Sequence, residues 1–409
     1  MRPVRACLPA LALVLLLPGL LLPGAAGAQT RPVAASSLAA HLDRAVALDA
    51  TARSLAAQRD AAAARGALVR SPIAGSPLVG GSLRGDTRGP REVWELDLEV
   101  AAPVWLPGQR TALGGTVTAA VTEVEARLLA RRLELAGLLR DTWWNAAGAA
   151  REARLARDRL ATARDIGRDV TRRVELGDIP PAEGLLARNE TLAAELGLVQ
   201  TEADLTAARA VYQVLTGGAQ PDLPPEPLAS RTLSHPALRA AETGLASAEA
   251  RARLVAATPR DNPELGVFGR GQDGTRTEQG VSVGLRLRVP LGTEARNAPR
   301  RADAQAELTR ATAELAQRRR LLEAEIGAAN AALRAAEAVG RLARQRLEVA
   351  DQQLGIARRA FQAGETGLFD LYRVRQLQLD AAGAEARASV AAGRTRSRLN
   401  QALGAAPGA

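Results

Sequence analysis

An internal repeat constrains the fold of this chain more than any other feature. Two long runs rich in Ala, Leu and Arg each stop at a glycine, Gly177 or Gly364, and resume within a few residues. These glycines are 187 residues apart, and the same offset relates Glu183 to Asp370. About forty residues around each break stay in register, so we expect two copies of one structural unit.

Upstream of each break, the sequence predicts a long helix. Small and apolar residues recur there at alternating intervals of three and four, which is the period of a coiled-coil seam. These positions are Ala156, Leu160, Ala163, Gly167, Val170 and Val174 in the first copy, and Ala343, Leu347, Ala350, Leu354, Ala357 and Phe361 in the second. The expected long helices span about 109–176 and 296–362, and shorter helices span about 37–66, 182–217, 234–258 and 367–404.

Two segments alternate between apolar and polar residues, which predicts strands with one apolar and one polar face. They lie at 93–105 and 280–292 and end at prolines that are again 187 residues apart. Each is expected to pair with a preceding strand, at 262–271 in the second copy and, more weakly, near 67–79 in the first. The fold class is therefore mainly α with a small β part, in a duplicated order of helix, β-hairpin, long helix, break and helix.

Four strands are too few to close a membrane barrel, for which about eight is the practical minimum. An open sheet in lipid leaves unpaired edge groups that cost several kcal/mol each, so strands that enter a membrane require an oligomer. A dimer gives eight strands with a filled interior, whereas a trimer gives twelve and leaves a lumen. The polar positions suit a water-facing interior; they are Glu95, Asp97, Glu99, Arg286 and Arg288. Trp94 and Trp105 suit an interfacial belt, and buried packing is an equally good interpretation of either.

The first residues have the organisation of a secretory signal peptide. Arg2 and Arg5 precede an apolar stretch, and Ala26-Gly27-Ala28 offers a cleavage site, so we expect residues 1–28 to be removed near Ala28. A membrane anchor is the weaker alternative, because prolines interrupt the stretch. The single cysteine, Cys7, would leave with the signal, so no disulfide or lipid attachment is expected.

The composition argues against catalysis. Two histidines and one cysteine are too few for a metal cage or a thiol mechanism, so no catalytic, cofactor or metal site is expected. The motif GRGQDG (269–274) leads into strand residues instead of a helix, and we interpret it as a hairpin turn. Arginine alternates with acidic residues along the expected helices, so the formal charge of +10 does not indicate a nucleic-acid partner.

This arrangement resembles the TolC-like outer membrane efflux family, over nearly the whole mature chain. The resemblance rests on the duplicated breaks, with Gly-Asp or Gly-Glu followed by an acidic residue and Arg188 or Arg375, on "VPLG" at 289–292, and on the closing "LTG" and "ALG". It implies trimers with a 12-stranded outer-membrane β-barrel, four strands per protomer, and an α-helical barrel in the periplasm. It further implies that the helix breaks form a periplasmic tip that gates the duct and meets an adaptor protein.

The resemblance assigns the tip, with its adaptor contact and gate, to two short segments. These are Gly177, Asp178, Ile179, Pro180 and Pro181, and Gly364, Glu365, Thr366 and Gly367, together with Asp370. Glycine suits the end of each long helix, the two prolines suit the first turn of the returning helix, and Thr366 is expected to cap the other. Asp178, Glu365 and Asp370 would place acidic groups near the opening. The alternative is that both segments are only helical-hairpin turns.

The expected function is a passive exit duct rather than an enzyme. Its partners would be two further copies of the chain, a periplasmic adaptor, an inner-membrane pump and outer-membrane lipid, in an RND-type metal or small-molecule efflux system. Type I secretion is an alternative, and a soluble periplasmic coiled-coil scaffold or adaptor is the rival class. We expect a signal peptide at 1–28, a first repeat at 29–217, a Pro-rich linker at 218–233 and a second repeat at 234–409, with hairpins near 67–104 and 262–290.

Overall fold

A computed structural model describes residues 37–85, 93–230, 234–274 and 279–407. The expected signal peptide and residues 231–233 of the expected linker lie outside the described residues. Residues Ser37–Ala409 form one unit, to which the following description applies. Within the described part of the chain, every helix is too short or too polar to cross a membrane.

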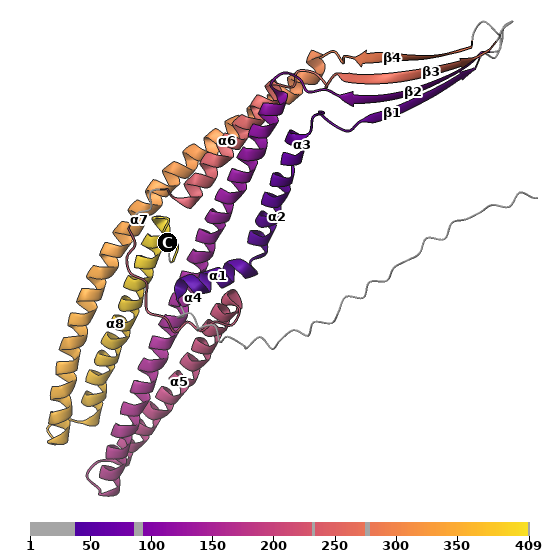
Figure 1. The fold of residues 1–409 in the computed structure, drawn as a ribbon. Coiled ribbons are helices and arrows are strands. Elements are labelled where there is room, and N and C mark those ends of the chain that lie inside the picture. The colour runs from indigo at the N-terminus through magenta and orange to yellow at the C-terminus, as the bar shows by residue number, and fades with distance from the viewer. Residues whose placement is uncertain (1–36, 86–92, 231–233, 275–278, 408–409) are drawn as a thin grey trace, which may run out of the picture. The chain divides into compact units, whose positions relative to one another are not determined.

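Four antiparallel strands form one sheet in the order β1-β2-β3-β4 (Figure 1). They are β1 (Leu78–Gly85), β2 (Trp94–Pro103), β3 (Glu264–Asp273) and β4 (Gly280–Arg288). This sheet, which extends beyond one end of the helices (Figure 1), confirms the prediction of a mainly helical chain with a small β part. The two hairpins are neighbours through β2 and β3, where Trp94 pairs with Asp273 and Pro103 with Glu264.

Two expectations about the strands were wrong in position. The first strand was expected near 67–79, but Gly66–Arg70 is a short helix, α3, and the strand begins only at Leu78. Helix α3 packs on the next long helix, where Arg110 Nε donates to the carbonyl of Val69 at 2.6 Å. The strand itself contains Gly80, Gly81 and Gly85, which carry no side chain to show the alternation. Residues 269–273 of the GRGQDG motif are the end of β3 and not a turn, because their backbone pairs with β2.

The helices divide the chain more finely than the sequence indicated. They are α1 (Leu38–Leu48), α2 (Ala50–Ala64), α3 (Gly66–Arg70), α4 (Gln109–Glu175), α5 (Pro181–Thr216), α6 (Pro236–Ala256), α7 (Glu294–Gln362) and α8 (Leu368–Ala402). The single helix expected at 37–66 is broken at Asp49, whose extended backbone ends α1. Its carboxylate accepts a bond from Ala52 N at 2.7 Å and so caps α2.

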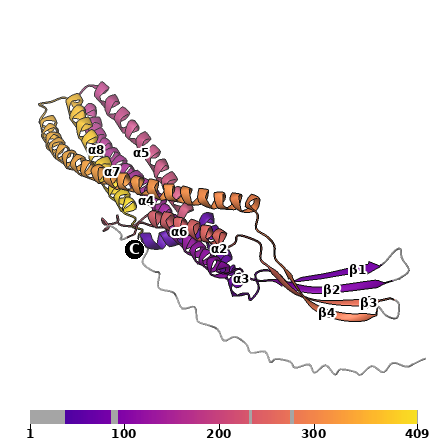
Figure 2. The ribbon, with the colours of Figure 1, turned by 90° about the horizontal axis from the view of Figure 1, so that it is seen from above.

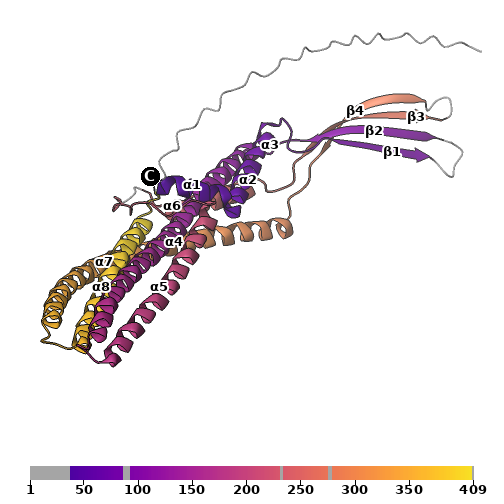
Figure 3. The ribbon, with the colours of Figure 1, turned by 90° about the horizontal axis from the view of Figure 1, so that it is seen from below.

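The helices lie side by side in one layer (Figures 1, 2 and 3). At the end that carries the breaks at Gly177 and Gly364, the order of the helices is α7, α8, α4, α5. At the end near the sheet, the order is α7, α6, α4, α2. Helices α4 and α7, with 67 and 69 residues, run through both parts and are each about 100 Å long. Shorter helices are stacked end to end beside them. The layer therefore has two open edges, α7 on one side and α5 with α2 on the other.

An aromatic cluster forms the core where the shorter helices meet. Trp143 and Trp144 of α4 pack there with Tyr212 of α5 and Leu42 of α1. The Tyr212 hydroxyl lies 2.7 Å from His41 Nδ1, and Trp144 Nε1 donates to Ser397 Oγ at 2.8 Å. Burial raises the pKa of the Tyr212 hydroxyl and lowers the pKa of His41, so both groups are neutral at physiological pH.

Arg140 ties the Pro-rich segment after α5 and the residues after α8 to the middle of α4. Its side chain is buried, and it donates to both carboxylate oxygens of Glu226, at 2.7 and 3.0 Å. It also donates to Gln401 Oε1 at 2.7 Å and to the carbonyl of Ala405 at 2.8 Å. This guanidinium therefore has a complete set of partners despite its burial.

Candidate functional site

One face of the sheet is apolar and fully open. The strand register places the apolar residues of all four strands on this face, so that Leu98 of β2 lies level with Gly269 of β3 and Val283 of β4. Its large side chains are between 49% and 85% exposed. They are Val79, Leu83, Trp94, Leu96, Leu98, Val100, Leu265, Val267, Val281, Val283, Leu285 and Leu287. Proteins in water rarely expose so large a continuous apolar surface, so this face indicates apolar surroundings.

The opposite face of the sheet is polar, and its charges pair between strands, including pairs that join β2 and β4 across β3. Arg270 Nε lies 2.8 Å from Asp97 Oδ1, and Arg288 Nη2 lies 3.1 Å from Glu99 Oε2. Arg286 also pairs with Glu99, and its guanidinium carbon lies 4.8 Å from the centre of the Phe268 ring. Further bonds on this face join Arg288 to Glu264, Gln272 to Glu95 and Ser82 to Asp97. The structure thus brings together the polar residues that the sequence assigned to a water-facing interior.

The outer edges of β1 and β4 carry unpaired backbone groups. Within the described residues, β1 pairs only with β2 and β4 only with β3. An exposed edge of eight or nine residues is a template for pairing with another chain. A sheet with one apolar face and two open edges therefore satisfies its backbone in apolar surroundings only as part of a larger, closed sheet.

The two tryptophans named from the sequence have different environments. Trp94 begins β2 on the apolar face and is 58% exposed. Trp105 follows β2, is half-buried, and donates from Nε1 to the carbonyl of Ser71 at 3.2 Å. Trp105 therefore packs against the loop that precedes β1.

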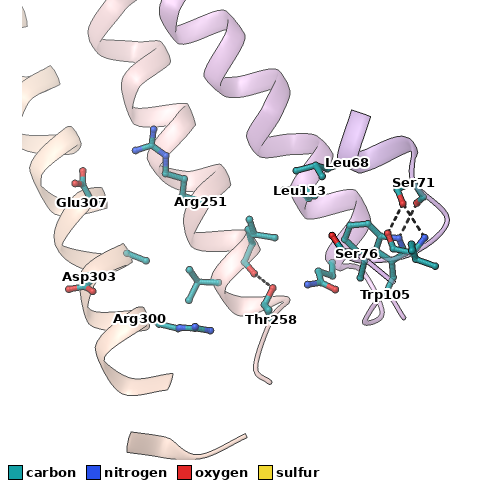
Figure 4. A pocket seen from close by; sticks show the side chains of 17 residues that line it. Leu68, Ser71, Ser76, Trp105, Leu113, Arg251, Thr258, Arg300, Asp303 and Glu307 are labelled. Atoms are coloured by element: carbon teal, nitrogen blue, oxygen red, sulfur yellow. Dashed lines mark hydrogen bonds between the residues drawn. The ribbon is translucent and has the colours of Figure 1, made fainter. Parts of the chain in front are cut away.

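A cavity of about 690 Å³ lies where the helices meet the sheet (Figure 4). Leu68, Trp105 and Leu113 line one side, and Arg251 and Glu307 lie across from them on α6 and α7. Sequence reasoning missed this cavity. Its walls come from four separate segments, and no periodic signal links them.

At the far end of the long helices, the chain makes two equivalent turns. We call Leu176–Pro180 and Ala363–Gly367 the tip turns. Gly177 and Gly364 both have φ of +76°, a left-handed conformation that glycine adopts without a penalty. The N–H of Asp178 donates to the carbonyl of Arg173, and the N–H of Glu365 to that of Ala360, both at 2.9 Å. Both turns therefore show the same Schellman ending of a helix.

The returning helices start differently. Pro180 is the N-cap of α5 and Pro181 its first residue, as the sequence suggested. The expectation that Thr366 caps α8 was wrong, because Gly367 occupies the N-cap position and no side chain bonds to the first turn. Asp178, Glu365 and Asp370 are exposed, and among the described residues none of them forms an ion pair within this chain.

The two tip turns lie at the same end of the helix layer (Figures 1 and 3). One hydrophobic core lies behind them. Val170 of α4 and Ala187 of α5 pack there with Phe361 of α7 and Leu368 of α8, and Ile179 lies at the margin. Packing between α4 and α8 therefore holds the two helical hairpins together.

Alanine at either tip glycine should destabilise the protein. At φ of +76° a β-carbon costs about 1–2 kcal/mol, so Gly177→Ala and Gly364→Ala should each lower the unfolding temperature. Gly197→Ala is the control, because Gly197 lies inside α5 with open space around it, and alanine there should stabilise by about 0.5–1 kcal/mol. Thermal unfolding followed by circular dichroism compares the three, and equal effects would contradict the turn geometry.

Comparison with known proteins finds one matching protein family and similar solved structures. The protein-family model described as "Outer membrane efflux protein" matches residues 229–405. Protein CyaE of Bordetella pertussis is 29% identical over 299 residues, which is 65% of this chain and 63% of that relative. The chain thus spans less than two thirds of this relative's length. The family consists of channels and not of enzymes.

Solved structures share the fold at low sequence identity. The outer membrane protein VceC of Vibrio cholerae matches with a TM-score of 0.70 and 17% identity, over 90% of this chain and 96% of VceC. CusC, described as forming a transmembrane channel, matches with a TM-score of 0.72 and 14% identity, over 90% of this chain and 92% of CusC. At these identities the likeness concerns the fold alone.

Proposed function

We propose that this chain, which matches the outer membrane efflux protein family over residues 229–405 and shares the fold of VceC and CusC, is a TolC-like channel protein of which three copies form the exit duct of a tripartite efflux system. The duct conducts substrates passively from an inner-membrane pump and its periplasmic adaptor to the outside. On this proposal, residues 1–28 direct export and are removed, and the repeats 29–217 and 234–409, joined by the linker 218–233, build each protomer.

The two-faced sheet is the observation that carries this proposal. Its exposed apolar face suits outer-membrane lipid, and its ion-paired face suits a water-filled lumen. Three copies supply twelve strands, and pairing of β1 with β4 of the next copy removes every open edge. Trp94 then lies at the end of the apolar face where an interfacial side chain belongs.

The open edges of the helix layer support a ring of identical copies. On α7, Leu321, Leu342, Val349 and Ile356 are exposed and spaced by multiples of seven residues. On α5, at the other edge, Leu185, Leu192, Leu196 and Val199 form a second exposed stripe. Two different edges that fit each other make a head-to-tail contact, which closes into a ring when the rotation allows.

The two tip turns are proposed as the gate and the adaptor contact. Asp178 and Glu365 of the turns, and Asp370 in the first turn of α8, are exposed and free of ion pairs within the described part of this chain, so they are available to a partner or to a neighbouring copy. The proposed substrates are metal ions or small molecules of an RND-type pump. Type I secretion is the second candidate, and the likeness to protein CyaE favours it.

Fractionation with cross-linking tests the proposed duct. We expect a cross-linked trimer in the outer-membrane fraction of cells that express the full chain, and ion conductance when the purified trimer is added to a planar lipid bilayer. A monomer or dimer that is released with soluble periplasmic proteins would refute the duct and favour the scaffold. Co-expression with an RND pump or with a type I exporter, in cells that lack their own duct, then distinguishes the two transport candidates.

A further inference from the structure

Two buried arginines in this protein have very different surroundings. Arg140 and Arg375 are both 4% exposed. Arg140 has the two carboxylate oxygens of Glu226 and two further acceptors. Arg375, on α8 near the tip turns, has one hydrogen bond, from Nη2 to the backbone carbonyl of Arg159 at 2.8 Å. Among the described residues, no carboxylate lies within ion-pair distance of Arg375.

The neighbours of Arg375 do not compensate its charge. Its guanidinium carbon lies 6.0 Å from the ring centre of Tyr372, and the Tyr372 hydroxyl is itself buried without a hydrogen-bond partner among the described residues. Arg159 and Arg358 add like charge nearby, and among the described residues Glu190 is the one carboxylate whose charge opposes them. Burial disfavours the charged form of this side chain and so lowers the pKa of Arg375 below its ordinary value.

The internal repeat shows why this charge is buried. Arg375 corresponds to Arg188 on α5, at the same 187-residue offset that relates the tip turns. Arg188 is exposed because α5 lies at the open edge of the helix layer. Helix α8 lies inside the layer between α7 and α4, so the equivalent side chain is covered. An arginine at this position therefore has little effect on the stability of the first copy of the repeat, where it is exposed, and destabilises the packing of the second copy, where it is buried.

A buried charge without a partner raises the free energy of the state in which it is buried. If α8 moved away from α4, Arg375 would gain contact with water and the Tyr372 hydroxyl would gain a hydrogen-bond partner. Nothing comparable is gained at Arg140, whose charge is already compensated. The penalty therefore acts on the packing of the two hairpins at the tip and leaves the middle of the layer unaffected.

We propose that Arg375 keeps the tip metastable, because its unpaired buried charge opposes the packing of α8 on α4 and so favours separation of the two tip turns. This inference rests on the proposed function, in which separation of the tip turns opens the duct. It identifies Arg375 as a positioning residue of the gate that acts through its own desolvation. If Arg375 instead stabilised the packed tip, as a latch does, its removal would favour separation of the two tip turns.

Hydrogen exchange on the full-length protein in detergent tests this inference without requiring a channel. In Arg375→Met, the backbone amides of residues 368–380 should exchange about tenfold more slowly than in the natural protein, since the packed tip is no longer penalised. Arg375→Leu should behave in the same way, and Tyr372→Phe should slow exchange by a smaller factor. Arg188→Met is the matched control and should leave exchange unchanged.

Faster or unchanged exchange in both Arg375 variants would overturn the inference, and so would their failure to accumulate as folded protein. Bilayer conductance is then measured on the same samples. The open fraction should fall about tenfold in Arg375→Met and stay unchanged in Arg188→Met. A rise in the open fraction would identify a latch and refute the proposal. Absence of conductance in the natural protein would refute the duct, and the exchange measurement would still decide the role of Arg375.

Discussion

Arginine in place of Val283 should abolish insertion of the protein into the outer membrane, whereas arginine in place of its neighbour Ser282 should be tolerated. Val283 lies in the middle of β4 on the exposed apolar face. An arginine on the lipid face of a barrel costs about 2–4 kcal/mol near the middle of the bilayer, and a trimer carries three of them. Such a penalty is comparable to the whole stability of many proteins.

Ser282 makes this comparison sharp because it is adjacent in sequence and on the opposite face. In the strand register, Ser282 lies opposite Arg270, whose charge is already compensated by Asp97. Water in the proposed lumen would screen an added arginine at this position. The outer-membrane yield of both variants, with heat-resistant trimer as the measure of folding, checks the prediction. Equal yields would mean that the apolar face does not meet lipid, and would leave the sheet without its proposed role.

Loss of the Arg140 side chain should have the largest effect on stability of any single change at an ion pair in this chain. In Arg140→Ala, the Glu226 side chain, which is only 12% exposed, is left without its cation, and the acceptors on Gln401 and Ala405 lose their donor. Removing one partner of a buried ion pair costs about 3–5 kcal/mol. The Pro-rich segment and the C-terminal residues should then detach from α4, which limited proteolysis would detect.

Arg157→Ala is the matched control on the same helix. Arg157 also binds a glutamate, Glu202, at 2.8 Å, but both side chains are about half exposed. Exposed pairs contribute about 0–1 kcal/mol, so this variant should unfold almost like the natural protein. Arg140→Met combined with Glu226→Gln should recover much of the lost stability, because no unpaired charge remains. If Arg140→Ala and Arg157→Ala prove equally stable, the buried network does not hold the middle of the layer together.

The parts of the fold that sequence reasoning predicted are those in which side chains repeat with a regular period. The seam of α4 and α7 and the alternation of β2 and β4 gave the helices and strands, and the breaks at Gly177 and Gly364 were located because glycine is needed there. The first strand was misplaced because Gly80, Gly81 and Gly85 carry no alternating pattern. The break at Asp49 was missed because a capping carboxylate in the middle of a helical pattern resembles any exposed aspartate.

What the sequence could not reveal depends on which helix lies next to which. Arg188 and Arg375 occupy equivalent positions and cannot be distinguished by pattern, yet only one of them is covered by neighbouring helices. The same holds for Arg140 and Arg157, which both look like exposed arginines of a helix rich in charge. Burial of a charge is decided by the order of helices in the layer, and that order follows from contacts between residues far apart in sequence.

The duplication also determines how many equivalent binding sites the tip turns would offer to a partner protein. The two turns share one backbone conformation, but they differ in side chains, with Asp178 and Pro180 in one and Glu365 and Gly367 in the other. Three copies in a ring would present six turns of two alternating kinds. A partner that recognises only the backbone would find six quasi-equivalent sites, whereas one that recognises the side chains would find three. The stoichiometry of a complex at the tip therefore reports which of these features the partner reads.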